Sequence, residues 1–284
     1  MSFTPTIHND TYAYIDPLKY SMAGKTVMIT GASKGCGRAM AIGYARAGIS
    51  NLILAARSPI STKEILEAAK SAGRPEPKML TLKVNVSDRH DVEAAAKSVE
   101  QEFGKLDILI NNAGYLGRFE PFTENDPDDW WQNWETNIKG IFLMSRSFIP
   151  LLLKSELKTI INITSEGAHV ILQGASGYMT TKLAMVRLGE FLDVDYKEQG
   201  LLAYAVNPGG VHTDLAHNMP EFTWGPVLVD QPELCGETVP WLTSEKRDWL
   251  AGRYVSCPWD MQELLRRKED VVEKDLLKIR LKIT

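Results

Sequence analysis

A tyrosine and a lysine four residues apart, Tyr178 and Lys182, are the residues of this chain best suited to proton transfer. Positions i and i+4 of a helix share a face, so the two side chains lie together if the segment SGYMTTK is helical. An ammonium group beside a phenol lowers the phenol's pKa and makes it a usable acid and base. Ser165, thirteen residues before Tyr178, adds a hydroxyl that can bind a substrate oxygen. These three side chains predict an acid–base site.

A glycine-rich segment upstream, TGASKGCG, has the composition of a phosphate-binding loop. It follows the apolar run Val27–Ile29 and precedes an alanine-rich helical pattern that ends at Gly48. A strand, a tight turn and a helix N-terminus in this order place backbone N–H groups around a pyrophosphate. We expect Gly31 and Gly35 to allow the turn and the close phosphate approach, and Gly37 to let the helix pack on the strand without a Cβ.

Strand patterns and helical patterns alternate along the rest of the chain. We expect strands at residues 27–30, 51–57, 79–86, 106–112, 159–165, 201–209 and 252–257, and helices from 37, at 62–72, 88–103 and 127–153, and around 178. Strands separated by such helices form a parallel sheet with helices on both faces, which predicts one α/β domain with a Rossmann-type, doubly wound parallel β-sheet. Ligands of such sheets bind beyond the carboxyl ends of the strands, where Gly31, Asn111, Ser165 and Pro208 fall.

Further short motifs follow in a fixed order. Asn111–Gly114 reads NNAG after a strand pattern, Asn137 lies in the helix after three tryptophans, and Pro208–Thr213 reads PGGVHT. Together with TGxxxGxG and YxxxK, these segments resemble the classical short-chain dehydrogenase/reductase (SDR) family over roughly residues 22 to 256. The resemblance implies four catalytic residues: Asn137, Ser165, Tyr178 and Lys182.

By this resemblance Ser165 binds the substrate oxygen, Tyr178 exchanges a proton with it, and hydride passes between nicotinamide C4 and the carbonyl carbon. Lys182 would lower the pKa of Tyr178 and also reach the nicotinamide ribose, and the backbone of Asn137 would hold a water of the proton relay. Thr164 is the alternative to Ser165, but its spacing to Tyr178 is one residue too long.

The resemblance also implies the coenzyme-binding residues. They belong to the glycine-rich loop, the ends of the following strands, the NNAG segment, the catalytic pair and the PGGVHT loop: Gly31, Ser33, Lys34, Gly35, Cys36, Gly37, Arg57, Ser58, Asn85, Val86, Asn112, Ala113, Gly114, Tyr178, Lys182, Pro208, Gly209, Val211 and Thr213.

The end of the second expected strand favours NADP over NAD. NAD enzymes of this fold usually carry an acidic residue there, whereas this chain has Ala56 followed by Arg57 and Ser58. Arginine pairs well with a 2′-phosphate, and Lys34 adds a second positive charge nearby. Asn85 replaces an aspartate that commonly accepts the adenine amino group, so we expect a weaker contact there.

Composition limits the possible partners. The chain has 284 residues and a net charge of −4, with basic and acidic residues interleaved, so it has no basic stripe for nucleic acid. No apolar run approaches the ~18 residues of a membrane span, and the first residues lack the features of a signal peptide. Three scattered cysteines indicate a reducing compartment and no metal site. We expect a cytoplasmic protein that acts on a small molecule.

Two extensions flank the shared core within one NADP-binding domain of residues 1–284. The first covers residues 1–21, and the second covers residues 257–284. The second begins as a charged helix with Leu264, Leu265, Val271 and Val272 on part of one face. Its end, LLKIRLKIT, alternates with period two like an edge strand. We expect both extensions to pack on the core or on another subunit of a homodimer or homotetramer.

The segment after PGGVHT predicts the cover of the substrate pocket. Asp214–Val229 contains Met219, Phe222, Trp224 and Pro226, which indicates an apolar, mobile lid. Such a lid suits an apolar, multi-ring or polyketide-like ketone better than a sugar.

Other residues lie close to these motifs in sequence. Tyr115, His169 and Gln173 are candidates for the pocket wall or for ordinary surface or packing positions. His212 and His217 are expected to cap loops, because no partner is spaced for metal ligation.

The sequence thus predicts an NADP(H)-dependent carbonyl (ketone) reductase, or the reverse alcohol dehydrogenase, acting on a small, largely apolar ketone or secondary alcohol. Two alternatives stay open. One is a non-redox isomerase or cyclase on the same fold. The other is an NADP-binding scaffold or sensor, which would usually have lost the tyrosine or the lysine, and here both are present.

Overall fold

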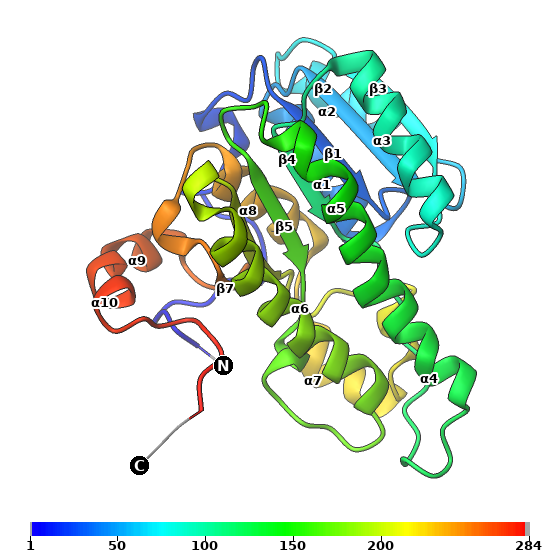
Figure 1. Cartoon of the computed structure of the whole chain (residues 1–284). Helices are drawn as coiled ribbons and strands as arrows, with labels where there is room; N and C mark the ends of the chain where they lie inside the picture. The colour runs from blue at the N-terminus through cyan, green and yellow to red at the C-terminus, as the bar shows by residue number, and fades with distance from the viewer. Residues whose placement is uncertain (1, 282–284) are drawn as a thin grey trace.

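Seven apolar segments form one parallel sheet in the computed structural model, which describes residues 2–281 (Figure 1). The strands are β1 (Thr26–Thr30), β2 (Asn51–Ala56), β3 (Lys78–Lys83), β4 (Ile108–Asn111), β5 (Thr159–Ile163), β6 (Leu202–Asn207) and β7 (Arg253–Ser256). Their order is β3-β2-β1-β4-β5-β6-β7, and every pair is parallel. The order reverses between β1 and β4, where a sheet of this kind binds its ligand. The predicted single Rossmann-type domain is confirmed.

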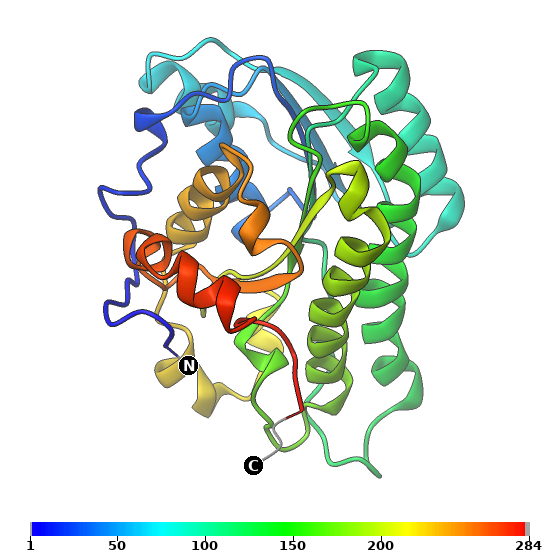
Figure 2. The same ribbon diagram turned by 60° about the vertical axis from the view of Figure 1, so that its left-hand side comes forward.

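Helices cover both faces of this sheet. They are α1 (Gly35–Arg46), α2 (Lys63–Ser71), α3 (Arg89–Phe103), α4 (Pro127–Trp134), α5 (Gly140–Leu152), α6 (Ser176–Tyr196), α7 (Trp224–Val227), α8 (Pro232–Thr243), α9 (Met261–Arg266) and α10 (Lys268–Glu273). Short 3₁₀ turns are η1 (Pro17–Lys19), η3 (Glu166–Ala168), η4 (Lys197–Gln199), η5 (Ala216–Asn218), η6 (Glu221–Thr223) and η7 (Asp248–Leu250). Helix α1 packs against α2 and α8, while α3, α5 and α6 lie on the opposite face (Figure 2).

The central strands are buried on both faces, as their continuous apolar sequences require. All residues of β1, β5 and β6 are buried, whereas β3 at the edge is partly exposed. Two apolar clusters fill the space between sheet and helices, one around Tyr44 of α1 and one around Phe148 of α5. The polar residues at the strand ends are therefore held on a rigid frame.

The helix expected at residues 127–153 starts as its sequence predicts and runs without a break to Leu152, but it contains one π-helical stretch. Asp126 caps it and accepts hydrogen bonds from the N–H groups of Asp128 and Asp129 at 2.8 and 3.0 Å. After α4 the chain forms a π-helix, η2 (Glu135–Lys139), before α5 continues. The predicted helix is therefore present, and its π-turn accommodates an extra residue that hydrophobic spacing does not show. Asn137 lies in the middle of η2.

The two terminal segments pack against each other. The side chain of Glu263 accepts a hydrogen bond from the Thr6 N–H at 2.9 Å, and His8 contacts Asp260 at 2.9 Å. Leu264 of α9 and Val271 of α10 are buried, so part of the expected apolar face does cover the core. Among the described residues, no helix combines the length and the apolarity that a membrane span needs.

The edge strand expected at the C-terminal end is absent from the described residues up to 281. Residues 282–284 of that segment lie outside the described part. The backbone turns away from an extended path at Asp275 and Leu277, whose φ angles are 47° and 63°. One backbone hydrogen bond, from Tyr254 N–H to Leu277 O at 2.8 Å, joins this segment to β7. The alternating pattern therefore misled the prediction, because left-handed residues interrupt strand pairing.

Candidate active site

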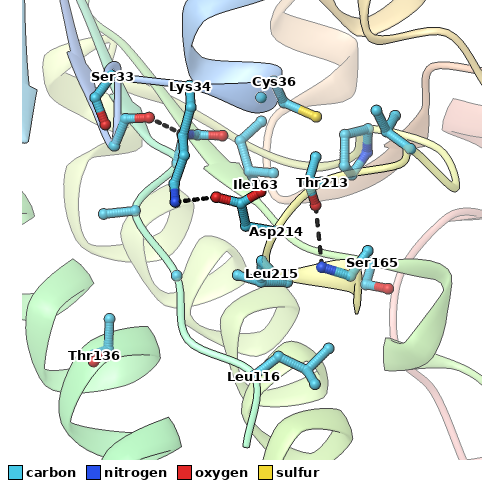
Figure 3. Close-up of a pocket in the computed structure, with 18 of the residues that line it drawn as sticks. Ser33, Lys34, Cys36, Leu116, Thr136, Ile163, Ser165, Thr213, Asp214 and Leu215 are labelled. Carbon is cyan, nitrogen blue, oxygen red and sulfur yellow. Dashed lines mark hydrogen bonds and ion pairs between the residues drawn. The ribbon is translucent and has the colours of Figure 1, made fainter. Parts of the chain in front are cut away.

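A cavity of about 700 Å³ opens at the carboxyl edge of the sheet (Figure 3). Every coenzyme residue expected from the sequence lines it except Gly37. Ser165, Tyr178 and Lys182 line the same cavity, whereas Asn137 lies behind its wall. Motifs spread over 180 residues of sequence thus meet in one place, from Gly31 to Thr213.

The glycine-rich loop has the geometry that its sequence predicts. Gly31 and Gly35 have φ angles of 66° and 56°, in the region that favours glycine. A Cβ on Gly37 would lie 2.3 Å from the Gly31 carbonyl oxygen, so no side chain fits between helix and strand. This cradle at the N-terminus of α1 suits the pyrophosphate of a dinucleotide.

The NNAG segment is clamped to the glycine-rich loop. The Asn112 side chain donates to the carbonyl oxygens of Thr30 and Gly31 at 2.8 and 3.2 Å. The Thr30 hydroxyl oxygen accepts from the N–H groups of Asn112 and Ala113 at 2.9 and 3.0 Å. The two walls of the coenzyme cleft therefore hold each other in position.

Asn137 is fully buried and its amide is fully used. Its Oδ1 accepts from the Tyr115 N–H at 2.8 Å, and its Nδ2 donates to Tyr115 O at 2.9 Å and to Thr181 Oγ1 at 3.0 Å. A buried amide needs such partners. The side chain joins the loop after NNAG to helix α6, which carries Tyr178 and Lys182.

Lys182 lies on α6 behind Tyr178. Its side chain is 4% exposed, its Nζ donates to Ile163 O at 2.9 Å, and Nζ is 5.3 Å from the centre of the Tyr178 ring. Burial lowers the pKa of Lys182 to about 7. The buried amine can therefore change its charge near neutral pH.

Tyr178 and Ser165 both line the cavity, and their side chains are hydrogen-bonded to each other. Burial raises the pKa of Tyr178, and a hydrogen bond with the Ser165 side chain offsets part of that effect. With the protein's own groups alone, the pKa of Tyr178 therefore lies above its ordinary value and not below it, as the neighbouring Lys182 had led us to expect. The Ser165 hydroxyl also accepts from Gly167 N–H at 3.0 Å. The rival hydroxyl, that of Thr164, is buried and donates to Lys182 O at 2.9 Å.

The end of the cavity expected to take the adenosine carries exposed polar side chains. Arg57 and Ser58 follow β2 and are exposed, and Ser58 Oγ donates to Ser33 Oγ at 3.1 Å. The neutral Ala56 ends β2 where an acidic residue would repel a phosphate. Asn85 is exposed, and its Oδ1 already accepts from Ser87 N–H at 3.2 Å.

Lys34 does not stand free for a phosphate. It forms an ion pair with Asp214, the first residue of the lid (Figure 3). The lysine lowers the pKa of that carboxyl group. Both side chains line the cavity, so the pair links the glycine-rich loop to the lid.

The substrate side of the cavity is mostly apolar. Met219 lines it as the sequence suggested, but Phe222 is 85% exposed and the Trp224 indole donates to Met219 O at 3.0 Å outside it. The remaining apolar wall consists of residues that sequence reasoning did not single out: Leu116, Leu215, Ala216, Val227 and Leu228. Their position depends on loop paths, for which the sequence carries no periodic signal.

Tyr115, His169 and Gln173 are not among the residues that line the cavity. The Tyr115 hydroxyl donates to Asp129, and the His169 ring packs edge-on against Tyr254. Tyr115 and His169 therefore have packing contacts, and Gln173 is an exposed surface residue.

His212 lines the cavity, and its Nδ1 is 3.2 Å from His217 Nε2. Over residues 2–281, no group of three or more metal-ligating side chains is found.

Comparison with known proteins identifies the class. The family model for short chain dehydrogenases matches residues 25–224, and the chain belongs to that family of oxidoreductases. It is 51% identical to "Short chain dehydrogenase mpl6" of Monascus purpureus, over 96% of this chain and 94% of the relative. It is 43% identical to "Short chain dehydrogenase pigC" of Monascus ruber, over 98% and 93%.

A solved structure gives the same fold. The 3-ketoacyl-(acyl-carrier-protein) reductase from Brucella melitensis, complexed with NADH, matches with a TM-score of 0.72 and 25% identity, over 83% of this chain and 97% of that one. The protein is thus an enzyme of a family whose fold binds a nicotinamide coenzyme.

Proposed function

We propose that the protein is an NADP(H)-dependent carbonyl reductase, or the reverse alcohol dehydrogenase, for a small, largely apolar ketone or secondary alcohol. One observation carries the proposal: Ser165, Tyr178 and Lys182 share a cavity with the glycine-rich loop. Acid–base groups and a dinucleotide cradle in one cavity suit hydride and proton transfer to a carbonyl group.

The chain's own residues would act on the carbonyl oxygen. Ser165 donates a hydrogen bond to it, and Tyr178, kept protonated by burial, donates the proton that makes the hydroxyl group. A cationic Lys182 beside the ring stabilises the phenolate that remains. Asn137 positions the pair through α6, and we assign its backbone to the proton relay. The coenzyme, when bound, supplies the hydride.

The preference for NADP rests on charge. Arg57 is exposed at the adenosine end and has neutral neighbours along the chain, so it can pair with a 2′-phosphate. The Lys34–Asp214 pair contributes less to that preference than expected, because the carboxylate competes for the lysine.

The substrate class follows from the apolar wall. Leu116, Leu215 and Met219 come from two loops, and Val227 and Leu228 from the end of the lid. A surface of this kind desolvates an apolar ketone at little cost but leaves the hydroxyl groups of a sugar without partners.

The non-redox alternative is less favoured, because a cyclase does not need Ser165, Tyr178 and Lys182 placed together beside a dinucleotide cradle. A scaffold or sensor has no need of the buried Lys182 at all, since burying an amine costs free energy.

A panel of ketones tests this proposal. Purified protein is mixed with NADPH or NADH and each ketone, and coenzyme oxidation is followed optically. We expect turnover with apolar ketones and a preference for NADPH. Turnover of sugars alone would contradict the substrate class, and faster turnover with NADH would contradict the coenzyme assignment.

We also propose a homodimer or homotetramer, housed in the cytoplasm. Phe142 of α5 and Phe191 and Val194 of α6 are more than half exposed on neighbouring helices (Figure 2). Exposed apolar side chains of this size mark association surfaces. The three free cysteines suit a reducing compartment. Light scattering should show an oligomer for the wild type and a monomer for Phe191→Glu; a monomeric wild type would contradict this.

A further inference from the structure

One buried carboxylate lies beside the cavity without a role in the mechanism above. Asp230 is the first residue after the lid and is 8% exposed. Burial raises its pKa, as does the negative charge of nearby Glu166. Keeping a carboxylate in such a place costs free energy, so its contacts indicate what it stabilises.

Those contacts all go to the PGGVHT loop. Asp230 Oδ2 accepts from the Gly210 N–H at 2.6 Å, and its own N–H donates to Gly210 O at 2.9 Å. Asp230 also forms a parallel β-bridge with Val211. The end of the lid and this loop are therefore joined by both backbone and side chain.

Steric fit supports the same contact. Gly209 has a φ of 96°, and a Cβ there would lie 2.5 Å from Asp230 Oδ2. A Cβ on Gly210 would lie 1.8 Å from Val227 O. The two glycines thus let the loop come close enough for the carboxylate and the lid backbone to hold it.

The loop is tied on its other side to the catalytic serine. Asn207 Oδ1 accepts from the N–H groups of Gly209 at 3.3 Å and of Glu166 at 3.2 Å, and Glu166 directly follows Ser165. Residue 231, next to Asp230, donates its N–H to Asn9 O at 2.8 Å. Asp230 therefore stands on an anchored segment and holds the loop against the reacting end of the cavity.

We propose that Asp230 is a positioning residue that fixes the Pro208–Val211 loop under the nicotinamide and ties it to the end of the lid. This rests on the proposed function, and it takes the Pro208–Val211 loop, one of the expected coenzyme-binding segments, to hold the nicotinamide half because the loop lines the cavity together with Ser165 and Tyr178. Removing the carboxylate should loosen that half of the site and leave the adenosine half, around Arg57, unchanged.

The experiment separates the two halves with a fragment. Binding of NADPH and of adenosine 2′,5′-bisphosphate, which lacks the nicotinamide half, is measured by calorimetry for the wild type and for Asp230→Ala. We expect NADPH to bind about tenfold more weakly, because ordering the loosened loop then costs binding free energy, and the bisphosphate to bind as before. Asp230→Asn should restore NADPH binding, because its amide oxygen still accepts from Gly210.

Glu233→Ala, an exposed acidic residue on the first turn of α8, is the matched control and should bind both ligands normally. If Asp230→Ala does not fold, Asp230→Ser, whose hydroxyl is too short to reach the Gly210 N–H, tests the same contact and should give the same selective loss. Equal weakening of both ligands, unchanged NADPH binding, or failure of Asp230→Asn to restore it would overturn the proposal. A wild type that binds the bisphosphate but not NADPH would instead contradict the proposed function, and the role of Asp230 with it.

Discussion

Two walls of this cavity are built differently. The wall proposed to bind the coenzyme, here the coenzyme wall, consists of the glycine-rich loop and the NNAG segment. The wall proposed to bind the substrate, here the substrate wall, consists of Leu116 and the lid. The coenzyme wall is held by partly buried polar contacts, such as those between Asn112 and the buried Thr30. The substrate wall comes from a lid with exposed side chains, and an ion pair between two exposed residues, Lys34 and Asp214, holds its first end. Buried hydrogen bonds fix geometry far better than exposed ion pairs do. The coenzyme should therefore be bound in one pose, while the lid can adapt to its substrate.

The contrast also explains why Asp230 matters. Its buried carboxylate makes a partly buried contact at the end of the lid, where the lid meets the Pro208–Val211 loop. The lid is fixed by Asp230 at its end, and only the exposed Lys34–Asp214 ion pair holds its start. It can therefore open without disturbing the Pro208–Val211 loop.

Removal of the tyrosine hydroxyl should have the largest effect on the coenzyme wall. Tyr178→Phe keeps the ring packing but removes the proton donor, so turnover should fall by roughly two orders of magnitude or more while NADPH affinity changes little. Steady-state kinetics and calorimetry measure the two quantities. Tyr115→Phe, outside the cavity, is the control and should stay close to wild type. Near-normal turnover of Tyr178→Phe would show that another group donates the proton.

Arg57→Ala should break the adenosine end selectively. Loss of a charged hydrogen bond to the 2′-phosphate should weaken NADPH binding by about 1.5–3 kcal/mol, and NADH binding should barely change. Lys63→Ala, an exposed cation on the first turn of α2, serves as the control. The same loss for both coenzymes would mean that Arg57 does not contact the phosphate.

The buried lysine predicts a pH dependence of stability. The pKa of Lys182 is about 7 in the folded protein, well below that of a free lysine, so the unfolded state binds more protons above pH 7. The free energy of unfolding should therefore rise with pH from about 7 to 10. Below pH 7, the cost of burying the charged Lys182 side chain is fully present. Relative to Lys182→Met, the wild type should gain up to about 1.4 kcal/mol per pH unit in that window. Urea unfolding of both at pH 7 and pH 9 measures this, and a constant difference would contradict it.

The smallest effect is expected at the ion pair between Lys34 and Asp214. Asp214→Asn frees Lys34 from its exposed partner, and exposed ion pairs contribute ~0.2–1 kcal/mol, so NADPH affinity should rise by about 1.4- to fivefold. NADH affinity should stay constant, since NADH lacks the 2′-phosphate. A fall in NADPH affinity would place Lys34 and Asp214 in a shared binding role instead.

The residues of the coenzyme wall were predictable from the sequence, because single residue types decide its geometry. Gly37 tolerates no Cβ, and Asn112 and Tyr178 act through one functional group each, so their spacing carries the information. The π-turn around Asn137 and the lid residues Val227 and Leu228 were not predictable in this way. Their placement depends on how the backbone packs after the sheet has formed.

In the C-terminal segment, the sequence pattern predicted an edge strand that the described residues do not form. Its alternating residues suit a strand, yet the left-handed conformation at Asp275 and Leu277 decides its path. Asp275 pairs with Arg253, Lys278 and Arg280, and these contacts lie far apart in sequence or depend on the turn itself. A periodic pattern cannot anticipate such contacts.

Transfer of deuterium tests the central claim most directly. The enzyme is given an accepted ketone and NADPH that carries deuterium at the transferred C4 position, and the product is analysed by mass spectrometry and NMR. We predict one equivalent of NADPH oxidised per product and deuterium on the carbinol carbon. Product formed without oxidation of NADPH, and without deuterium, would contradict the reductase and support a non-redox reaction in the same cavity.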